Sequence, residues 1–167
     1  VEGDLLVEGD DDSPAVTADG SGDVLLTSTD GQVSLNAGID GGEGNVSVVA
    51  VAEISQGGAG DIITAGIGSL YISAAGPVTM ADGATATSED GDIAYQSGED
   101  LSLGEISSIN GSVALTAIGN ILDGDAELDV SAVALTLDAG SGIGSNTDLL
   151  EVSVSSISAL VRDGGLY

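Results

Sequence analysis

Three short acidic segments contain the side chains of this chain that could bind a ligand. They comprise Asp10, Asp11 and Asp12, then Asp90 and Asp92, and then Asp123, Asp125 and Glu127. Carboxylate oxygens on turns are the ligands that Ca²⁺ prefers, so these eight residues are the candidate metal ligands. The last segment lacks the glycine and the distal glutamate of an EF-hand loop. At any single site, the alternative is that Asp and Gly simply form turns.

The charge balance excludes several classes of partner. The chain has 28 acidic residues and a single cation, Arg162, which gives a formal net charge of −27. Binding to nucleic acid or to anionic lipid depends on Lys and Arg, so neither is an expected partner. The acidity could serve solubility, adaptation to salty water, or cation binding along rows of carboxylates. The chain has no Cys, which excludes disulfides and thiolate metal sites.

A repeated phrase predicts the elements that position these acids. A glycine and a small polar residue precede aliphatic side chains two positions apart, the period of a half-buried strand. The phrase begins at Gly22, Gly44, Gly68, Gly91 and Gly111, at intervals of 22, 24, 23 and 20 residues. With shorter strands between these phrases, the pattern predicts an all-β fold, a parallel β-helix (β-solenoid) of about seven rungs of 20–24 residues.

Composition agrees with a narrow, repetitive interior. Hydrophobic residues make up 42% of the 167 residues and aromatic residues only 2%, while 27 residues are glycine. We therefore expect a core of stacked Val, Ile, Leu and Ala. No apolar run approaches the ~18 residues of a membrane span, so we expect no membrane insertion. Because strands one rung apart lie ~4.8 Å from each other, acids of successive rungs come close together and call for screening or a counterion.

The two ends of the chain suggest continuation. The sequence Gly-Gly-Leu-Tyr at 164–167 matches the internal phrase Gly-Ser-Leu-Tyr at 68–71, and a join from Tyr167 to Val1 would place Gly22 24 residues after Gly165. Aliphatic alternation would then continue across the join. We expect residues 1–167 to be one solenoid unit that continues into further copies head to tail, through Val1, Leu5, Val7, Leu166 and Tyr167. The join could be covalent, as in a tandem array, or a contact between subunits, and the alternative is that the ends match by chance.

The phrase resembles the filamentous-haemagglutinin-like β-strand repeats of very large bacterial surface and secreted proteins. The likeness covers nearly the whole chain and is strongest at Ala139–Ser145, Leu150–Val154 and Gly164–Tyr167. The resemblance implies a right-handed parallel β-helix, exported and located outside the cell or on its surface. It implies a role as a stalk, fibre or adhesin, but no adhesive residue carries over because the matched positions are structural.

The expected function is structural. Parallel β-helices include polysaccharide-cleaving enzymes, but such sites need a basic residue or a distinct carboxylate pair. With no His, no Lys and only Arg162, we expect no enzyme activity. We expect a repeat unit of an extracellular fibre, stalk or sheath that requires no cofactor, with Ca²⁺ as the candidate bound ion. The alternative is a segment of a secreted adhesin that binds a surface ligand or a carbohydrate.

Overall fold

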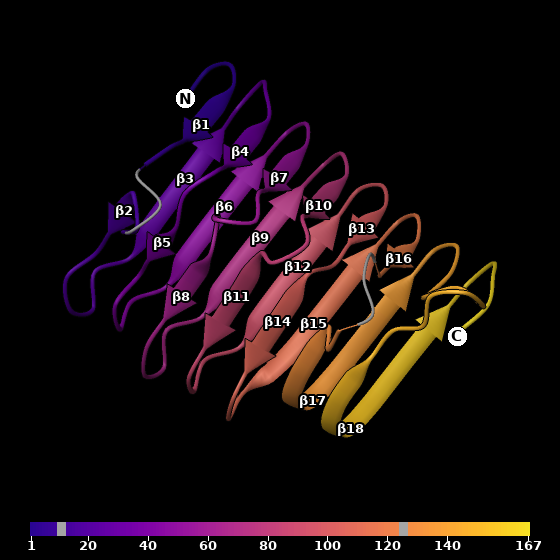
Figure 1. Cartoon of the computed structure of the whole chain (residues 1–167). Helices are drawn as coiled ribbons and strands as arrows, with labels where there is room; N and C mark the ends of the chain where they lie inside the picture. Colours follow the sequence, from indigo (N-terminus) through magenta and orange to yellow (C-terminus); the bar gives the residue numbers. More distant parts are fainter. Residues whose placement is uncertain (10–12, 124–126) are drawn as a thin grey trace.

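The computed structural model describes residues 1–9, 13–123 and 127–167. These residues form 18 β-strands and no helix, and the chain coils as a parallel β-solenoid of about six turns (Figure 1). The predicted all-β parallel β-helix is therefore confirmed. The described residues contain no helix long and apolar enough to cross a membrane.

Each circuit of the chain, called a layer here, contributes one strand to each of three parallel arrays. The first array consists of β1 (Leu5–Val7), β4 (Val33–Leu35), β7 (Ile54–Gln56), β10 (Val78–Met80), β13 (Leu101–Ser102) and β16 (Ile121–Leu122). The second contains β2 (Val16–Thr17), β5 (Ile39–Asp40), β8 (Ile62–Thr64), β11 (Thr85–Ser88) and β14 (Glu105–Ser108). The third contains β3 (Val24–Ser28), β6 (Val46–Ala50), β9 (Leu70–Ala74), β12 (Ile93–Ser97) and β15 (Ser112–Ala117).

Two long strands complete the second and third arrays. The start of β17 (Val130–Ala139) pairs with β14 and its second half pairs with β15, so one strand joins the two arrays. The last strand, β18 (Val152–Val161), pairs with β17 along its length. Layers therefore continue through the last third of the chain, where the repeating glycine phrase is absent.

The pairing of residues between neighbouring strands gives the length of each repeat. One column of paired inward-facing residues in the third array has intervals of 22, 24, 23, 20, 22 and 22 residues, and its members are Val24, Val46, Leu70, Ile93, Val113, Leu135 and Ile157. The first four intervals equal those predicted from the glycines. Seven layers separated by six turns account for the rung count expected from the sequence.

The glycine that begins each phrase is required by close packing between layers. A Cβ at Gly44, Gly68, Gly91 or Gly111 would collide with the backbone carbonyl oxygen of the glycine one layer earlier. At Gly22, the first glycine of this column, the nearest atom to such a Cβ would be the Asp19 carbonyl oxygen at 3.8 Å. The column therefore requires glycine because backbones of successive layers touch there.

The core is mainly aliphatic, and the buried polar residues are Ser28, Gln56, Thr64, Ser88, Ser97, Ser108 and Asp129. Columns of Val, Ile, Leu and Ala fill the interior, as the composition predicted. Tyr95 is also fully buried, and its hydroxyl donates a hydrogen bond to Gln56 Oε1 at 3.0 Å. Gln56 Nε2 in turn donates to the Thr85 carbonyl oxygen at 2.8 Å, so the polar groups of Tyr95 and Gln56 are hydrogen-bonded.

One prediction about the ends is wrong. The sequence match placed Leu166 and Tyr167 in the same part of the repeat as Leu70 and Tyr71. Instead, Leu166 pairs with Ile143, which pairs with Ile121 of β16 in the first array. The phrase Gly-x-Leu is too short to distinguish the first array from the third, since Gly3 also stands two residues before Leu5 of β1.

Candidate functional site

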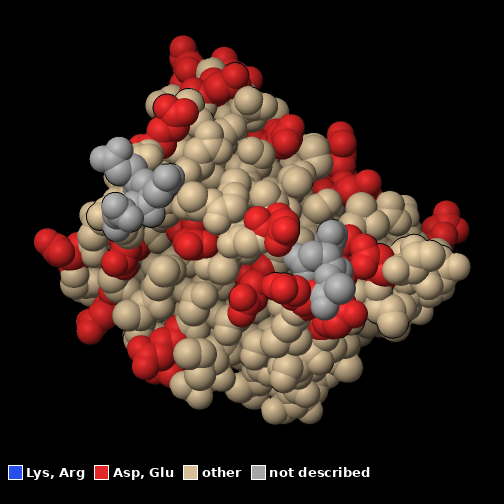
Figure 2. Space-filling view, in the orientation of Figure 1, with Lys and Arg blue, Asp and Glu red and all other residues tan. Residues whose placement is uncertain are grey.

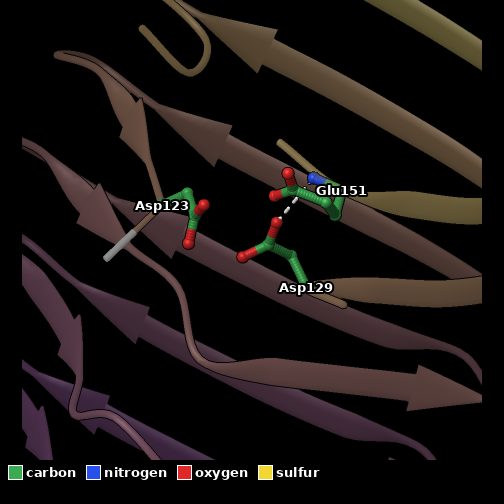
Figure 3. Close-up of side chains that lie close together, drawn as sticks. All are labelled: Asp123, Asp129 and Glu151. Atoms are coloured by element: carbon green, nitrogen blue, oxygen red, sulfur yellow. Dashed lines mark hydrogen bonds between the residues drawn. The ribbon is translucent and has the colours of Figure 1, made fainter. Parts of the chain in front are cut away.

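The carboxylates of Asp123, Asp129 and Glu151 form a cluster near the C-terminal end of the solenoid. One oxygen of each lies within 4.8 Å of the others, and no other such group of three or more occurs among the described residues (Figure 3). Asp123 follows β16, Asp129 directly precedes β17, and Glu151 directly precedes β18. Because Val130 pairs with Val152, the residues before these two strands are neighbours in adjacent layers.

Hydrogen bonds join Asp129 and Glu151, and one of them holds the Asp129 side chain. The Glu151 N–H donates to Asp129 Oδ2 at 2.7 Å, and the Asp129 N–H donates to the Glu151 carbonyl oxygen at 3.1 Å. Asp129 is only 2% exposed. Glu151 Oε2 is inaccessible to solvent and has no hydrogen-bond partner among the described residues. Burying a carboxylate without neutralising it is costly, so this cluster needs either a proton or a cation.

The cost of burying charge in the cluster raises the pKa values of Asp129 and Glu151. Burial raises the pKa of Asp129 to about 8, and hydrogen bonding with Asp123 and the charges of Asp123 and Glu151 add to the rise. The Glu151 N–H opposes it by stabilising the charged form. Burial also raises the pKa of Glu151, followed by the charge of Asp123. Near neutral pH the cluster therefore holds a proton, which a divalent cation could displace.

The structure separates the acids that the sequence grouped as metal ligands. Asp123 belongs to the cluster, whereas Glu127, Asp90 and Asp92 do not. Asp90 Oδ1 accepts a hydrogen bond from Asn110 Nδ2 at 2.7 Å, and Asp92 Oδ1 accepts one from the Ser112 N–H at 2.8 Å. The other candidate ligands, Asp10, Asp11, Asp12 and Asp125, lie outside the described residues.

Many acids of the turns connect one layer to the next. Asp23, Asp61 and Asp100 each accept a hydrogen bond from a backbone N–H in the following layer, donated by Asn45, Thr85 and Asn120 respectively at 2.7–2.9 Å. Figure 2 shows acidic side chains at several places along the outline of the molecule and on the face turned toward the viewer. Turn formation and layer linkage therefore account for much of the acidity without a metal.

Sequence reasoning missed Asp129 and Glu151. Asp129 continues the alternating acidic series of Asp123, Asp125 and Glu127 by one more step, whereas Glu151 lies in no such run, and the interval of 22 residues from Asp129 to Glu151 matches no short motif. A signal was nevertheless present, because each residue directly precedes a long alternating strand and 22 residues is one turn of the repeat. Aligning those two strands would have placed the two carboxylates side by side.

The open end of the solenoid at β18 is a second candidate site. Five β18 residues pair with the core-facing positions of β17, namely Val152, Val154, Ile157, Ala159 and Val161. No further layer of the described residues covers them, and Val152 is 37% exposed and Ile157 54% exposed. Their partners Val130 and Leu135, one layer inside, are at most 1% exposed. We call these five residues the β18 end face.

The opposite end has matching chemistry. The inward-facing residues of the first layer include Leu5, Val16 and Leu26, which pack against the core from its N-terminal end. These residues begin the same columns that end near β18. The described part of the chain thus has an aliphatic core that is exposed at β18, and its charged groups lie mainly in the turns.

Comparison with known proteins does not assign the chain to a class: no family model, curated protein or solved structure matches it. Function is therefore argued from the carboxylate cluster and the β18 end face.

Proposed function

We propose that the chain is a structural unit of an extracellular bacterial fibre, stalk or sheath, extended by end-to-end stacking of β-solenoid copies. The observation that carries this proposal is the β18 end face. Its residues occupy core positions in register yet remain exposed, and β18 pairs only with β17 among the strands that the structure describes. The location outside the cell rests on the resemblance to filamentous-haemagglutinin-like repeats.

The occupant that best fits the end face is a second copy. A covering layer must supply parallel strands and inward aliphatic side chains, and the first layer supplies both through Val16, Val24 and Leu26. Each layer of the solenoid already packs on its neighbour in this way, so stacking repeats an existing contact. Covering Ile157 alone removes a half-exposed large side chain from water, which favours association.

The test is a matched pair of substitutions on β18. Ile157→Lys places a charge in the end face, whereas Ser158→Lys places the same charge at the next position, which pairs with the outward-facing Thr136. We expect sedimentation velocity to show concentration-dependent assembly of the wild type and Ser158→Lys, and loss of assembly in Ile157→Lys. Assembly of Ile157→Lys to the wild-type extent would contradict the proposal.

A second function, Ca²⁺ binding, is favoured by the carboxylate cluster. One buried carboxyl with a raised pKa, two neighbouring carboxyls and an unpartnered, inaccessible Glu151 oxygen form an oxygen-rich site that a divalent cation would neutralise. Bound Ca²⁺ would displace the shared proton and link three successive strand ends. The acids of the turns that already accept hydrogen bonds need no cation to neutralise them.

Calorimetric titration with CaCl₂ tests this second function. We expect one site with a dissociation constant of about 10⁻⁴–10⁻³ M, the range of calcium sites in extracellular modules. Glu151→Gln should abolish it, and Asp92→Asn, which alters an acid outside the cluster, should leave it intact. Heats of dilution alone in the wild type, or equal binding by Glu151→Gln, would exclude the cluster as a calcium site.

A further inference from the structure

The outer face of the third array carries a groove that crosses β3, β6 and β9, three strands that lie side by side in Figure 1. Leu25, Ser47 and Tyr71 are in register on these strands, and all three side chains point outward. The small side chain of Ser47 therefore forms a floor between two larger ones. The groove has a volume of about 480 Å³, within the range of pockets that bind small molecules.

The two walls of the groove are largely apolar. Leu25 lies on one side of Ser47 and Tyr71 on the other, so the strands that carry the walls are two layers, or ~9.6 Å, apart. Tyr71 OH donates a hydrogen bond to Gln96 Oε1 at 2.9 Å, and Gln96 belongs to β12, on the side away from Ser47. This bond holds the ring in place, so little side-chain freedom is lost when a ligand packs on it.

A row of polar groups lines the start of the same strands. Asn45 Nδ2 donates to Asp23 Oδ1 at 3.0 Å, and Asn45 Oδ1 accepts a hydrogen bond from the Ser69 N–H at 3.0 Å. These bonds between layers position the row. The second oxygen of Asp23 can accept a further hydrogen bond, and the hydroxyls of Ser47 and Ser69, which also line the groove, can both donate and accept.

The combination of apolar walls and a polar row selects the class of ligand. A purely apolar ligand would cover the polar row without pairing it, which is costly. The net charge of −27 repels polyanions. Among the described residues that line the groove, Asp23 is the only acid, which offers little to a basic peptide. A neutral saccharide matches both parts, because the C–H faces of a pyranose ring are apolar and the hydroxyls on its edge both donate and accept hydrogen bonds.

We propose that this groove binds a neutral saccharide chain, with one pyranose ring packed between Leu25 and Tyr71. The hydroxyls of that ring face Asp23, Ser47 and Ser69. The proposal goes beyond the structural role and does not rest on stacking, since the groove lies on the outer face of β3, β6 and β9 and not on the β18 end face. Because the groove lies on an exposed face, we expect a dissociation constant of about 10⁻³ M for one short chain.

An NMR titration of the full ¹⁵N-labelled chain tests the site. The probes are tetrasaccharides of glucose, galactose, mannose and N-acetylglucosamine, all of them neutral. With at least one probe we expect saturable shifts of the amide signals of Ser47, Ser69 and Tyr71. The polyanion tetragalacturonate should cause none. Absence of saturable shifts with every neutral probe, or equal binding of tetragalacturonate, would overturn the proposal.

Matched substitutions in one outward-facing column locate the binding. Ser47→Leu fills the floor of the groove, so we expect affinity to fall by about tenfold or more. Ala114→Leu adds the same side chain to an outward position of β15, outside the groove, and should change affinity by less than about twofold. Tyr71→Ala removes one wall and should weaken binding by about tenfold. Melting temperatures establish that each variant is folded. Unchanged affinity in both Ser47→Leu and Tyr71→Ala would overturn the site.

Titration with tetralysine distinguishes a saccharide from a basic peptide as the occupant. Binding of a neutral saccharide should change little when NaCl is added, whereas binding of tetralysine to an acidic chain should weaken. Saturable tetralysine shifts at Ser47 and Ser69 that disappear in Asp23→Asn, without shifts from any saccharide, would overturn the proposal and assign the groove to a cationic partner.

Discussion

Among single residues, Asp129 has the least usual environment, because a nearly buried carboxyl faces two other acids. Its raised pKa means that the folded state binds a proton that the unfolded state releases between about pH 4 and pH 8. Folded-state stability from this group is therefore present at low pH and is lost as pH rises through about 8. The opposite sign holds for Asp138, whose pKa is lowered by its hydrogen bonds to Arg162.

We predict that Asp129→Asn flattens the dependence of stability on pH. The difference in unfolding free energy between wild type and variant should shift in favour of the variant between pH 5 and pH 8.5, since the variant has no carboxyl to ionise. Urea unfolding at the two pH values measures this, and the shared repulsion of the other acids cancels in the comparison. An unchanged difference across that range would show that Asp129 is not titrating in the folded protein.

A second residue-scale prediction concerns the buried polar pair in the core. Tyr95→Phe removes the hydroxyl that donates to Gln56 Oε1 and should cost about 1–3 kcal/mol of unfolding free energy, because a buried acceptor loses this partner. Tyr71→Phe is the matched control. Tyr71 OH donates to Gln96 Oε1 at 2.9 Å on the exposed surface, so the change should be within about 0.5 kcal/mol. If chemical denaturation gave the same loss of unfolding free energy for both variants, burial would not explain the contribution of the Tyr95–Gln56 hydrogen bond to stability.

At the scale of elements, the glycine column explains both what the sequence could predict and where prediction failed. The phrase marks a backbone contact between layers, so its spacing predicted the intervals of the third array from β3 to β15. The marker disappears beyond Gly111 because β17 runs through the corner between arrays, with Val133 N–H bonded to the Gly111 carbonyl oxygen. The layers persist there, but no glycine identifies them.

The candidate site was less predictable than the fold for a related reason. Alternation indicates which residues are inside, but contacts between layers depend on register over 20 or more residues. Asp123 was found because it lies in an acidic run, whereas Asp129 and Glu151 become neighbours only when β17 and β18 pair. Leu166 was misplaced because a three-residue phrase occurs in two arrays.

We predict that Gly91→Ala destabilises the solenoid strongly and that Gly22→Ala does not. The added methyl at position 91 would collide with the Gly68 carbonyl oxygen, and relief requires adjacent layers to separate, at a cost of about 3 kcal/mol. At position 22 the same methyl would meet only the Asp19 carbonyl oxygen at 3.8 Å. Thermal unfolding of the two variants compares them directly. Similar melting temperatures would contradict the packing explanation of the repeat.

At the scale of the whole molecule, the net charge of −27 opposes the proposed assembly. Copies stacked end to end bring like charges together, and dissolved ions screen that repulsion. We therefore predict that the association constant measured by sedimentation velocity rises between 20 mM and 300 mM NaCl. A fall over this range would indicate that attraction between charges, and not the apolar end face, drives association.

The most direct test of the account is electron microscopy of the assembled protein, with its axial repeat measured. End-to-end stacking predicts filaments with a layer spacing of ~4.8 Å and a unit repeat of about 34 Å, corresponding to seven layers. Separate single-chain particles at every concentration and salt condition would contradict the central claim that this solenoid extends by stacking on copies of itself.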